Sequence, residues 1–256
     1  MRASLSEPRA AAPRRAPRSV LVVGASHGVG YALAAHLVLQ AGSSSAQVHA
    51  TVRTAADGAS LTALGARVHL LDVTNASQRA ALVSSLEGEA PGLQALYHVA
   101  GVRGGNQDLV YATNLVAPFA LLELLMPLLM RGREQELDDG GGKNRAVAQR
   151  RAPRACIVTS DIRFGPRANR TLRSHYAHSK AAANERVRAL APQLFARHGL
   201  LLVAIHPGSV RTQMNRKGKV DASDSAAGVR AACEQATRPP EGILTSQGKQ
   251  MPWSAP

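Results

Sequence analysis

The chain has 256 residues, of which 45% are hydrophobic and 3% aromatic, so it can build one large core of Ala, Val and Leu. Its net charge of +14 would suit nucleic acid, yet no basic stripe carries the interleaved aromatic side chains of a single-strand binder, and we expect no specific nucleic-acid binding. No stretch approaches the roughly 20 apolar residues of a membrane span, so none is predicted.

Two low-complexity stretches hold much of the basic excess. Residues 1–18 contain five arginines and one glutamate, and residues 131–154 contain seven basic and four acidic residues. We expect a disordered extension at 1–18, a domain at 19–253 with an insertion loop at 131–154, and a tail at 254–256. The first stretch lacks the apolar run of a secretory signal. A cytoplasmic protein is predicted, with organelle import through the Arg-rich stretch as the alternative.

From residue 19 onward, short apolar runs alternate with helical patterns. Strands are predicted at 19–25, 46–53, 66–73, 93–101, 154–160, 200–208 and 242–246. Helices are predicted at 31–41, 60–66, 76–90, 108–130, 174–199 and 223–237. This order predicts a single α/β domain of the doubly wound, Rossmann type, with a mostly parallel seven-stranded sheet and helices on both faces. Its two cysteines, Cys156 and Cys233, are expected to be packed thiols in a reducing compartment.

Ligands of such folds bind beyond the carboxyl ends of the strands. The first strand ends in a glycine-rich turn followed by a helix, a context in which backbone can approach a pyrophosphate. The turn predicts contacts to the cofactor from Gly24, Ser26, His27, Gly28, Val29 and Gly30. The alternative is a tight turn that binds no ligand.

The ends of the second and third strands bear on the choice of cofactor. Arg53 stands where an acidic residue would favour NAD(H), and a guanidinium suits the 2′-phosphate of NADP(H). NADP(H) is therefore favoured over NAD(H), although Arg53 could instead be an ordinary solvated side chain. Asp72 can accept from an adenine amino group with Val73 packed beside the ring, or it can belong to a turn before a helix capped by Asn75.

These residues resemble the short-chain dehydrogenase/reductase family over nearly the whole of 19–253. In the family's order, the resemblance rests on GASHGVG, LDVT, HVAGV, ATNLVAP, CIVTS, YAHSK and HPGSVRTQM. The last of these, followed by SDSAAGVR, QGK and MPW, is similar to the C-factor and sniffer-type carbonyl reductase branch. The resemblance implies a site of Ser160, Tyr176 and Lys180 supported by Asn114.

The physical chemistry of these residues is consistent with that role. Tyr176 and Lys180 are four residues apart and share one face of a helix. A free tyrosine has a pKa of about 10. A nearby ammonium group and the positive charge of a nicotinamide would lower it, so that Tyr176 can donate a proton to a carbonyl oxygen. Ser160 would hold that oxygen. A kink at Asn114, with a bound water, would connect Lys180 to solvent.

The remaining cofactor contacts implied are Ala100, Gly101, Pro207, Gly208, Val210 and Thr212, together with Tyr176 and Lys180. Two features depart from the family. His98-Val99 replaces the usual Asn-Asn before Ala100-Gly101. The interval from Ser160 to Tyr176 is also longer than usual and holds four arginines, which could shift Ser160, form a basic rim for anionic substrates, or simply be solvated.

The main hypothesis is an NADP(H)-dependent carbonyl reductase, or the reverse alcohol dehydrogenase, with a fairly open site. The helices at 108–130 and 174–197 are rich in small residues, so a homodimer is expected. The alternative is a nucleotide-binding signalling or interaction protein of the same fold with little turnover. A third hypothesis is an RNA-associated protein that uses its basic tail.

Overall fold

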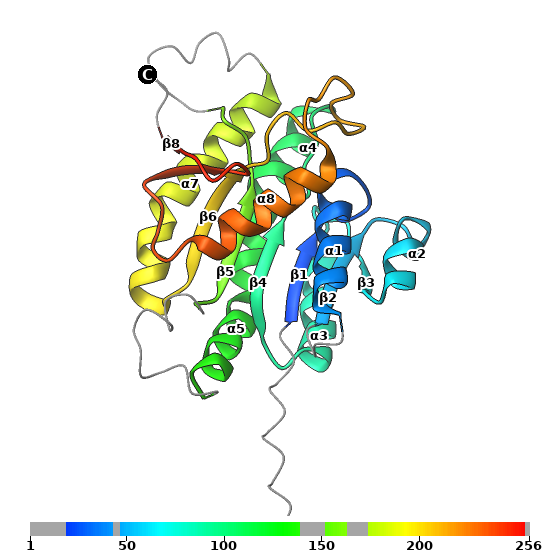
Figure 1. The fold of residues 1–256 in the computed structure, drawn as a ribbon, viewed down its shortest axis with the longest axis vertical. Coiled ribbons are helices and arrows are strands. Elements are labelled where there is room, and N and C mark those ends of the chain that lie inside the picture. Colours follow the sequence, from blue (N-terminus) through cyan, green and yellow to red (C-terminus); the bar gives the residue numbers. More distant parts are fainter. Residues whose placement is uncertain (1–18, 43–46, 139–151, 163–173, 254–256) are drawn as a thin grey trace, which may run out of the picture.

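One eight-stranded sheet organises the molecule (Figure 1). The computed structural model describes residues 19–42, 47–138, 152–162 and 174–253. The strand order is β3-β2-β1-β4-β5-β6-β7-β8, and only β8 is antiparallel to its neighbour. The strands are β1 Ser19–Val23, β2 Gln47–Val52, β3 Arg67–Leu70, β4 Leu93–His98, β5 Arg154–Val158, β6 Leu201–His206, β7 Gly242–Thr245 and β8 Gln250–Pro252.

Helices cover both faces of this sheet (Figure 1). They are α1 Gly28–Ala41, α2 Ala55–Leu64, α3 Ala76–Glu89, α4 Gln107–Tyr111, α5 Ala117–Asp138, α7 His175–His198 and α8 Ala222–Gln235. Alternate strand residues face opposite sides, so Leu21 and Leu96 pack with α3, α5 and α7. Val22 and Tyr97 pack with α1, α2 and α8. The two apolar layers make the sheet a rigid support for the loops at its carboxyl edge.

The predicted doubly wound α/β fold is confirmed, with two corrections. The sheet has eight strands and not seven, because β8 pairs with β7 through Gly242, Ile243 and Leu244. The second helix begins at Ala55 and not at residue 60, because the Thr54 side chain accepts a hydrogen bond from the Asp57 backbone N–H and starts the helix. The predictions for 1–18 and 254–256 lie outside the described residues. Of 131–154, α5 continues to Asp138 and β5 begins at Arg154.

The stretch predicted as one helix over 108–130 is interrupted. A π-helical turn, η1 (Ala112–Val116), lies between α4 and α5. Such a turn inserts an extra residue into the helix and is frequent at functional sites. Its consequence here is a local change in helix register at Asn114.

The combined stretch Gln107–Glu134 is long and apolar enough to cross a membrane by length and composition, with a mean hydropathy of 1.7. The expectation that no stretch comes near this length is therefore wrong. Half of the apolar window is buried inside the protein, and Leu121, Leu125 and Leu128 have no exposed surface. This burial is that of a core helix packed on the sheet, so the absence of a membrane span stays our prediction.

Candidate functional site

A cavity of about 850 Å³ opens at the carboxyl edge of the sheet. It lies beyond β1 and β4, where the strand order reverses direction, the usual ligand position in doubly wound folds. All the predicted cofactor-contact residues line it: Gly24, Ser26, His27, Gly28, Val29, Gly30, Arg53, Asp72, Val73, Ala100, Gly101, Tyr176, Lys180, Pro207, Gly208, Val210 and Thr212. Ser160 lines it as well, and Asn114 lies behind its wall.

The glycine turn between β1 and α1 is held tightly against β4. Gly24 has φ +88°, and a Cβ at this position would lie 2.6 Å from the backbone of Ala100. Its N–H donates to Thr51 Oγ1 over 3.1 Å. The N-terminus of α1 carries no acidic residue in its first turn, and His27 makes no capping bond with its side chain. The first N–H groups of α1 are thus available to an anion.

Arg53 follows the end of β2 on the rim of the cavity. Its backbone N–H donates to Ser26 Oγ over 3.3 Å, which links the strand end to the glycine turn. The guanidinium side chain is exposed. Asp72 lies beside it, and Asp72 Oδ1 accepts from both the N–H and the hydroxyl of Thr74, which lowers the pKa of the carboxyl. The turn interpretation of Asp72 therefore holds.

Asn114 is buried within η1 and fixed by three hydrogen bonds. Its Oδ1 accepts from the Val102 N–H over 2.9 Å, and its Nδ2 donates to the Val102 carbonyl over 2.8 Å. Nδ2 also donates to Ser179 Oγ over 3.0 Å. The amide thus ties the π-helical turn both to the loop after β4 and to α7, next to Lys180.

Lys180 is buried beneath the cavity floor, where its Nζ donates to the Val158 carbonyl over 3.1 Å. A Cβ on Gly101 would lie 3.4 Å from this Nζ and 3.2 Å from Asn114 Oδ1, so both polar groups lie against Gly101. Burial disfavours the charged ammonium form and lowers the pKa of Lys180 to about 8.

Tyr176 lies one helical turn before Lys180 and faces the same cavity. Burial raises the pKa of Tyr176 above its usual value, and the Asp161 charge raises it further. The Arg103 charge and a hydrogen bond with Ser160 lower that pKa in part. Without the cofactor, desolvation is the largest influence on this pKa, and the lowering expected from Lys180 together with a nicotinamide charge stays a prediction.

Ser160 reaches the cavity at the end of β5. Its hydroxyl donates to Asp161 Oδ1 over 3.0 Å. The amide of Asn184 holds this segment: Nδ2 donates to the carbonyls of Ser160 and Ile162, over 3.1 and 2.8 Å. Asn184 Oδ1 accepts from the hydroxyl of Thr159 over 2.7 Å. These bonds fasten the strand end to α7, the helix that carries Tyr176. The four arginines between Ser160 and Tyr176 lie outside the described residues.

The His98 that departs from the family pattern is buried, and its Nε2 has no hydrogen-bond partner among the described residues. Desolvation and the nearby Lys180 charge lower the pKa of His98 to about 3, so the imidazole is neutral. The Pro207 carbonyl accepts from the hydroxyls of Ser225 and Ser246, over 2.8 and 3.0 Å. These bonds fix the backbone at the end of β6, next to Gly208.

Three residues of the site were missed from the sequence. Arg103 lies with its guanidinium carbon 5.7 Å from the centre of the Tyr176 ring. Asp161 accepts from Ser160, and Asn184 fixes the strand end. Asn184 could have been predicted from its spacing. It follows Lys180 by four residues and Tyr176 by eight on one helix, so the three side chains share one face. Arg103 and Asp161 directly follow segments already assigned to the site.

The family model described as short chain dehydrogenase matches residues 18–137. A search of curated proteins gives no match. The NADPH-bound carbonyl reductase from chicken fatty liver is a similar solved structure, with a TM-score of 0.76 and 25% identity over 93% of this chain and 100% of that one. The carbonyl reductase Sniffer of D. melanogaster gives 0.76 and 22% over the same shares. A putative short-chain dehydrogenase/reductase from Burkholderia multivorans with bound NADP gives 0.71 and 24%, again over 93% and 100%.

Proposed function

We propose that the chain is an NADP(H)-dependent oxidoreductase of the short-chain dehydrogenase/reductase family that interconverts a carbonyl compound and an alcohol. The family model matches residues 18–137, and the chain is similar to an NADPH-bound carbonyl reductase, which supports the proposal. One observation carries the proposal. Ser160, Tyr176 and Lys180 line the same cavity as the glycine turn and Arg53, so the reacting groups and the anion-binding groups share one space.

The residues present fit a nicotinamide dinucleotide phosphate. The free N-terminus of α1 suits the pyrophosphate, and the exposed guanidinium of Arg53 suits a 2′-phosphate. The cavity volume of about 850 Å³ is near the upper end of the range for ligand sites. Two of the similar solved structures contain NADPH or NADP, which supports the same choice here. When bound, this cofactor supplies or accepts the hydride.

Three side chains of the cavity would bind the substrate oxygen, transfer the proton and bind the ribose. Ser160 would donate a hydrogen bond to the substrate oxygen, after its hydroxyl turns away from Asp161. Tyr176 would give its proton to that oxygen during reduction and take it back during oxidation. Its raised pKa keeps the phenol protonated at neutral pH, as reduction requires. Lys180 would bind the ribose and favour the phenolate left after the transfer.

Asn114 acts in this proposal as a positioning residue. Both amide hydrogens and one acceptor position hold Val102 and Ser179, so Asn114 fixes the loop after β4 relative to α7. The π-helical turn around it leaves a distorted backbone close to Lys180, where a water molecule could accept from the ammonium group.

A homodimer is proposed on a separate ground. Val116 on η1 and Leu124 on α5 are 53% and 40% exposed, and they lie eight residues apart along one continuous helical stretch. Ala189 is exposed on α7, a helix that contacts η1. Apolar and small residues on two neighbouring helices suit packing against a second copy of the chain.

The proposal is tested with the purified full chain, NADPH and a panel of aldehydes and ketones. NADPH consumption is followed for the wild type and for Tyr176→Phe. The variant lacks only the hydroxyl, so it should still bind NADPH and lose about 10³-fold or more of kcat, which is within the range for removal of a general acid.

The outcome that contradicts the proposal is equally definite. If NADPH binds but the wild type consumes no carbonyl faster than Tyr176→Phe, the protein is not a reductase of these compounds. The nucleotide-binding signalling alternative would then account for the retained cofactor affinity.

A further inference from the structure

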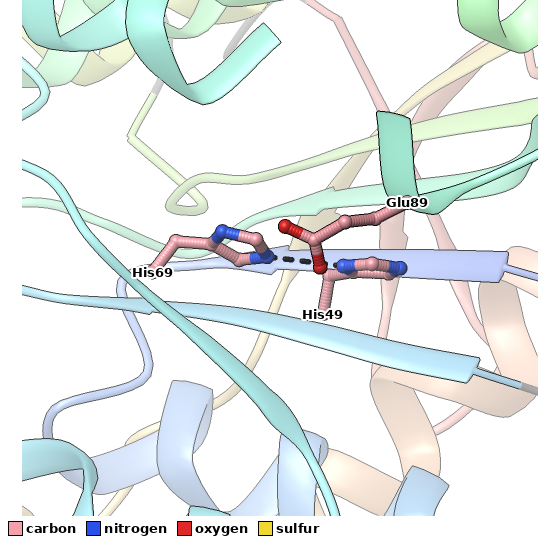
Figure 2. A group of neighbouring side chains, drawn as sticks. All are labelled: His49, His69 and Glu89. Atoms are coloured by element: carbon pink, nitrogen blue, oxygen red, sulfur yellow. Dashed lines mark hydrogen bonds between the residues drawn. The ribbon is translucent and has the colours of Figure 1, made fainter. Parts of the chain in front are cut away.

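A second cluster of ligand-type side chains lies away from the cavity, on the face of the sheet covered by α3 (Figure 2). His49 comes from the middle of β2, His69 from β3, and Glu89 is the last residue of α3. One ligand atom from each lies within 4.8 Å of the other two. None of the three lines the cavity, so the proposed oxidoreductase function does not use them.

The two imidazoles lie side by side, as Figure 2 shows. His49 Nδ1 and His69 Nε2 are 3.0 Å apart, and the ring centres are 5.3 Å apart with 21° between the planes. A hydrogen bond between two ring nitrogens requires one nitrogen with a hydrogen and one with a free lone pair. One of the two nitrogens therefore already carries a lone pair, and a tautomeric shift of the hydrogen to the other nitrogen of its own ring would give a second.

The Glu89 carboxylate is held beside these rings by two other contacts. Its Oε1 accepts from the Ser85 hydroxyl over 2.6 Å, and its Oε2 accepts from Arg67 over 3.1 Å. Each oxygen keeps a further lone pair. Hydrogen bonds of this kind orient the carboxylate ligands of metal sites.

His49 is a polar side chain in the interior of the protein. It has no exposed surface, and its Nε2 has no hydrogen-bond partner among the described residues. An aliphatic residue at this position in β2 would avoid an unsatisfied polar atom in the core. His69 and Glu89 are only partly buried, so the cluster is closed on the His49 side and open to solvent on the other.

We propose that His49, His69 and Glu89 bind one divalent transition-metal ion of the zinc type. Two imidazole nitrogens and one carboxylate oxygen form a known ligand set for zinc, with a fourth position left for water. Ligands about 2.0–2.2 Å from a tetrahedral ion lie about 3.3 Å from one another. The observed separations, 3.0 Å between the ring nitrogens and at most 4.8 Å overall, require only small side-chain movements.

The ring that holds the shared hydrogen must change tautomer when the ion binds. A hydrogen on His69 Nε2 is replaced by one on His69 Nδ1, and a hydrogen on His49 Nδ1 by one on His49 Nε2, so both imidazoles stay neutral. The Arg67 charge lies next to the site and weakens its attraction for a cation. With three protein ligands and this charge, the affinity should be on the order of 1–10 µM, weaker than that of closed structural zinc sites. The bound ion would join β3, an edge strand of the sheet, to β2 and α3.

The test uses untagged full-length protein that has been stripped with a chelator and then freed of it. Zn²⁺ binding is measured by isothermal titration, and thermal unfolding is followed with and without Zn²⁺. The wild type should bind one ion per chain and unfold at a higher temperature with zinc. His69→Gln and Glu89→Gln should each weaken binding by about tenfold or more and lose the thermal shift.

Two further variants separate ligation from general effects. His198→Gln removes an imidazole at the end of α7 and should leave zinc binding unchanged. Arg67→Gln removes the neighbouring charge but keeps an N–H donor for Glu89, so it should tighten binding several-fold, the opposite of what structural damage would cause. NADPH affinity, measured in parallel, should not change in any of them. The proposal is overturned if the wild type shows no saturable zinc binding, or if His69→Gln and Glu89→Gln both bind as the wild type does.

Discussion

The two ends of the cavity are built in different ways. At the end formed by β1, β2 and β3, the candidate cofactor contacts are backbone groups and the exposed side chain of Arg53. At the end formed by β4, β5 and α7, buried amides of Asn114 and Asn184 hold the chain through six hydrogen bonds. One end is thus shaped by the course of the backbone, and the other by side chains whose positions are fixed before any ligand arrives.

The largest effect is expected from removing Asn184, at the end of the cavity formed by β4, β5 and α7. Asn184→Ala leaves the hydroxyl of Thr159 and two carbonyls without their partner in the protein interior. We expect the free energy of unfolding to fall by about 2–4 kcal/mol, because buried polar groups are left unsatisfied. The value is obtained from urea unfolding. The turnover number should fall as well, because Ser160 loses its attachment to α7.

The control for this prediction is Gln193→Ala, which removes an exposed amide from the same helix. It should change neither stability nor turnover. If Asn184→Ala is as stable and active as this control, the second end does not depend on its buried amides.

Arg53 offers the corresponding test of the first end. Arg53→Gln removes an exposed charge without touching the core, so stability should not change. The dissociation constant for NADPH should rise by about 10–100-fold, the usual worth of a charge-assisted hydrogen bond to phosphate, whereas that for NADH should change little.

Fluorescence titration with both cofactors measures these constants. Arg188→Gln, a substitution of an exposed arginine on α7, serves as the matched control. An equal loss of affinity for NADPH and NADH would mean that Arg53 does not recognise a 2′-phosphate.

The last prediction concerns the pH dependence of the reaction. The pKa of Lys180 is about 8, so its ammonium form is present below that value and is lost as the pH rises through it. The pKa of Tyr176 is raised, so its proton is retained over the same range. The kcat/KM for carbonyl reduction should therefore be flat below about pH 7 and fall about tenfold per unit well above pH 8.

This profile is measured with circular dichroism at each pH, to verify that the protein remains folded. A profile that stays flat to pH 10 would show that the charge of Lys180 is not needed at this end of the cavity.

Much of the fold could be predicted because strands buried on both faces are continuous apolar runs. β8 was missed because a strand of three residues, one of them Pro252, carries no periodicity. The π-helical turn at Asn114 was expected only as a kink, since an extra residue in a helix barely alters its apolar pattern.

The candidate site was predictable at the level of position, because strand ends of a parallel sheet converge on one edge. Electrostatics were harder to predict. The pKa of Tyr176 depends on the burial of its ring and on the positions of the Arg103 and Asp161 charges. Neither can be derived from the spacing of residues in the sequence. The proximity of His49 to His69 depends on strand register, which brings residues 20 apart in sequence onto one face.

The short β8 has a consequence for self-association of the protein. Without it, β7 would present a row of unpaired N–H and C=O groups that could recruit a strand from another molecule. β8 covers that edge and is itself only three residues long, and Pro252 has no N–H to offer a further strand. A chain rich in aliphatic strands thereby ends its sheet with an element too short to act as a template for aggregation.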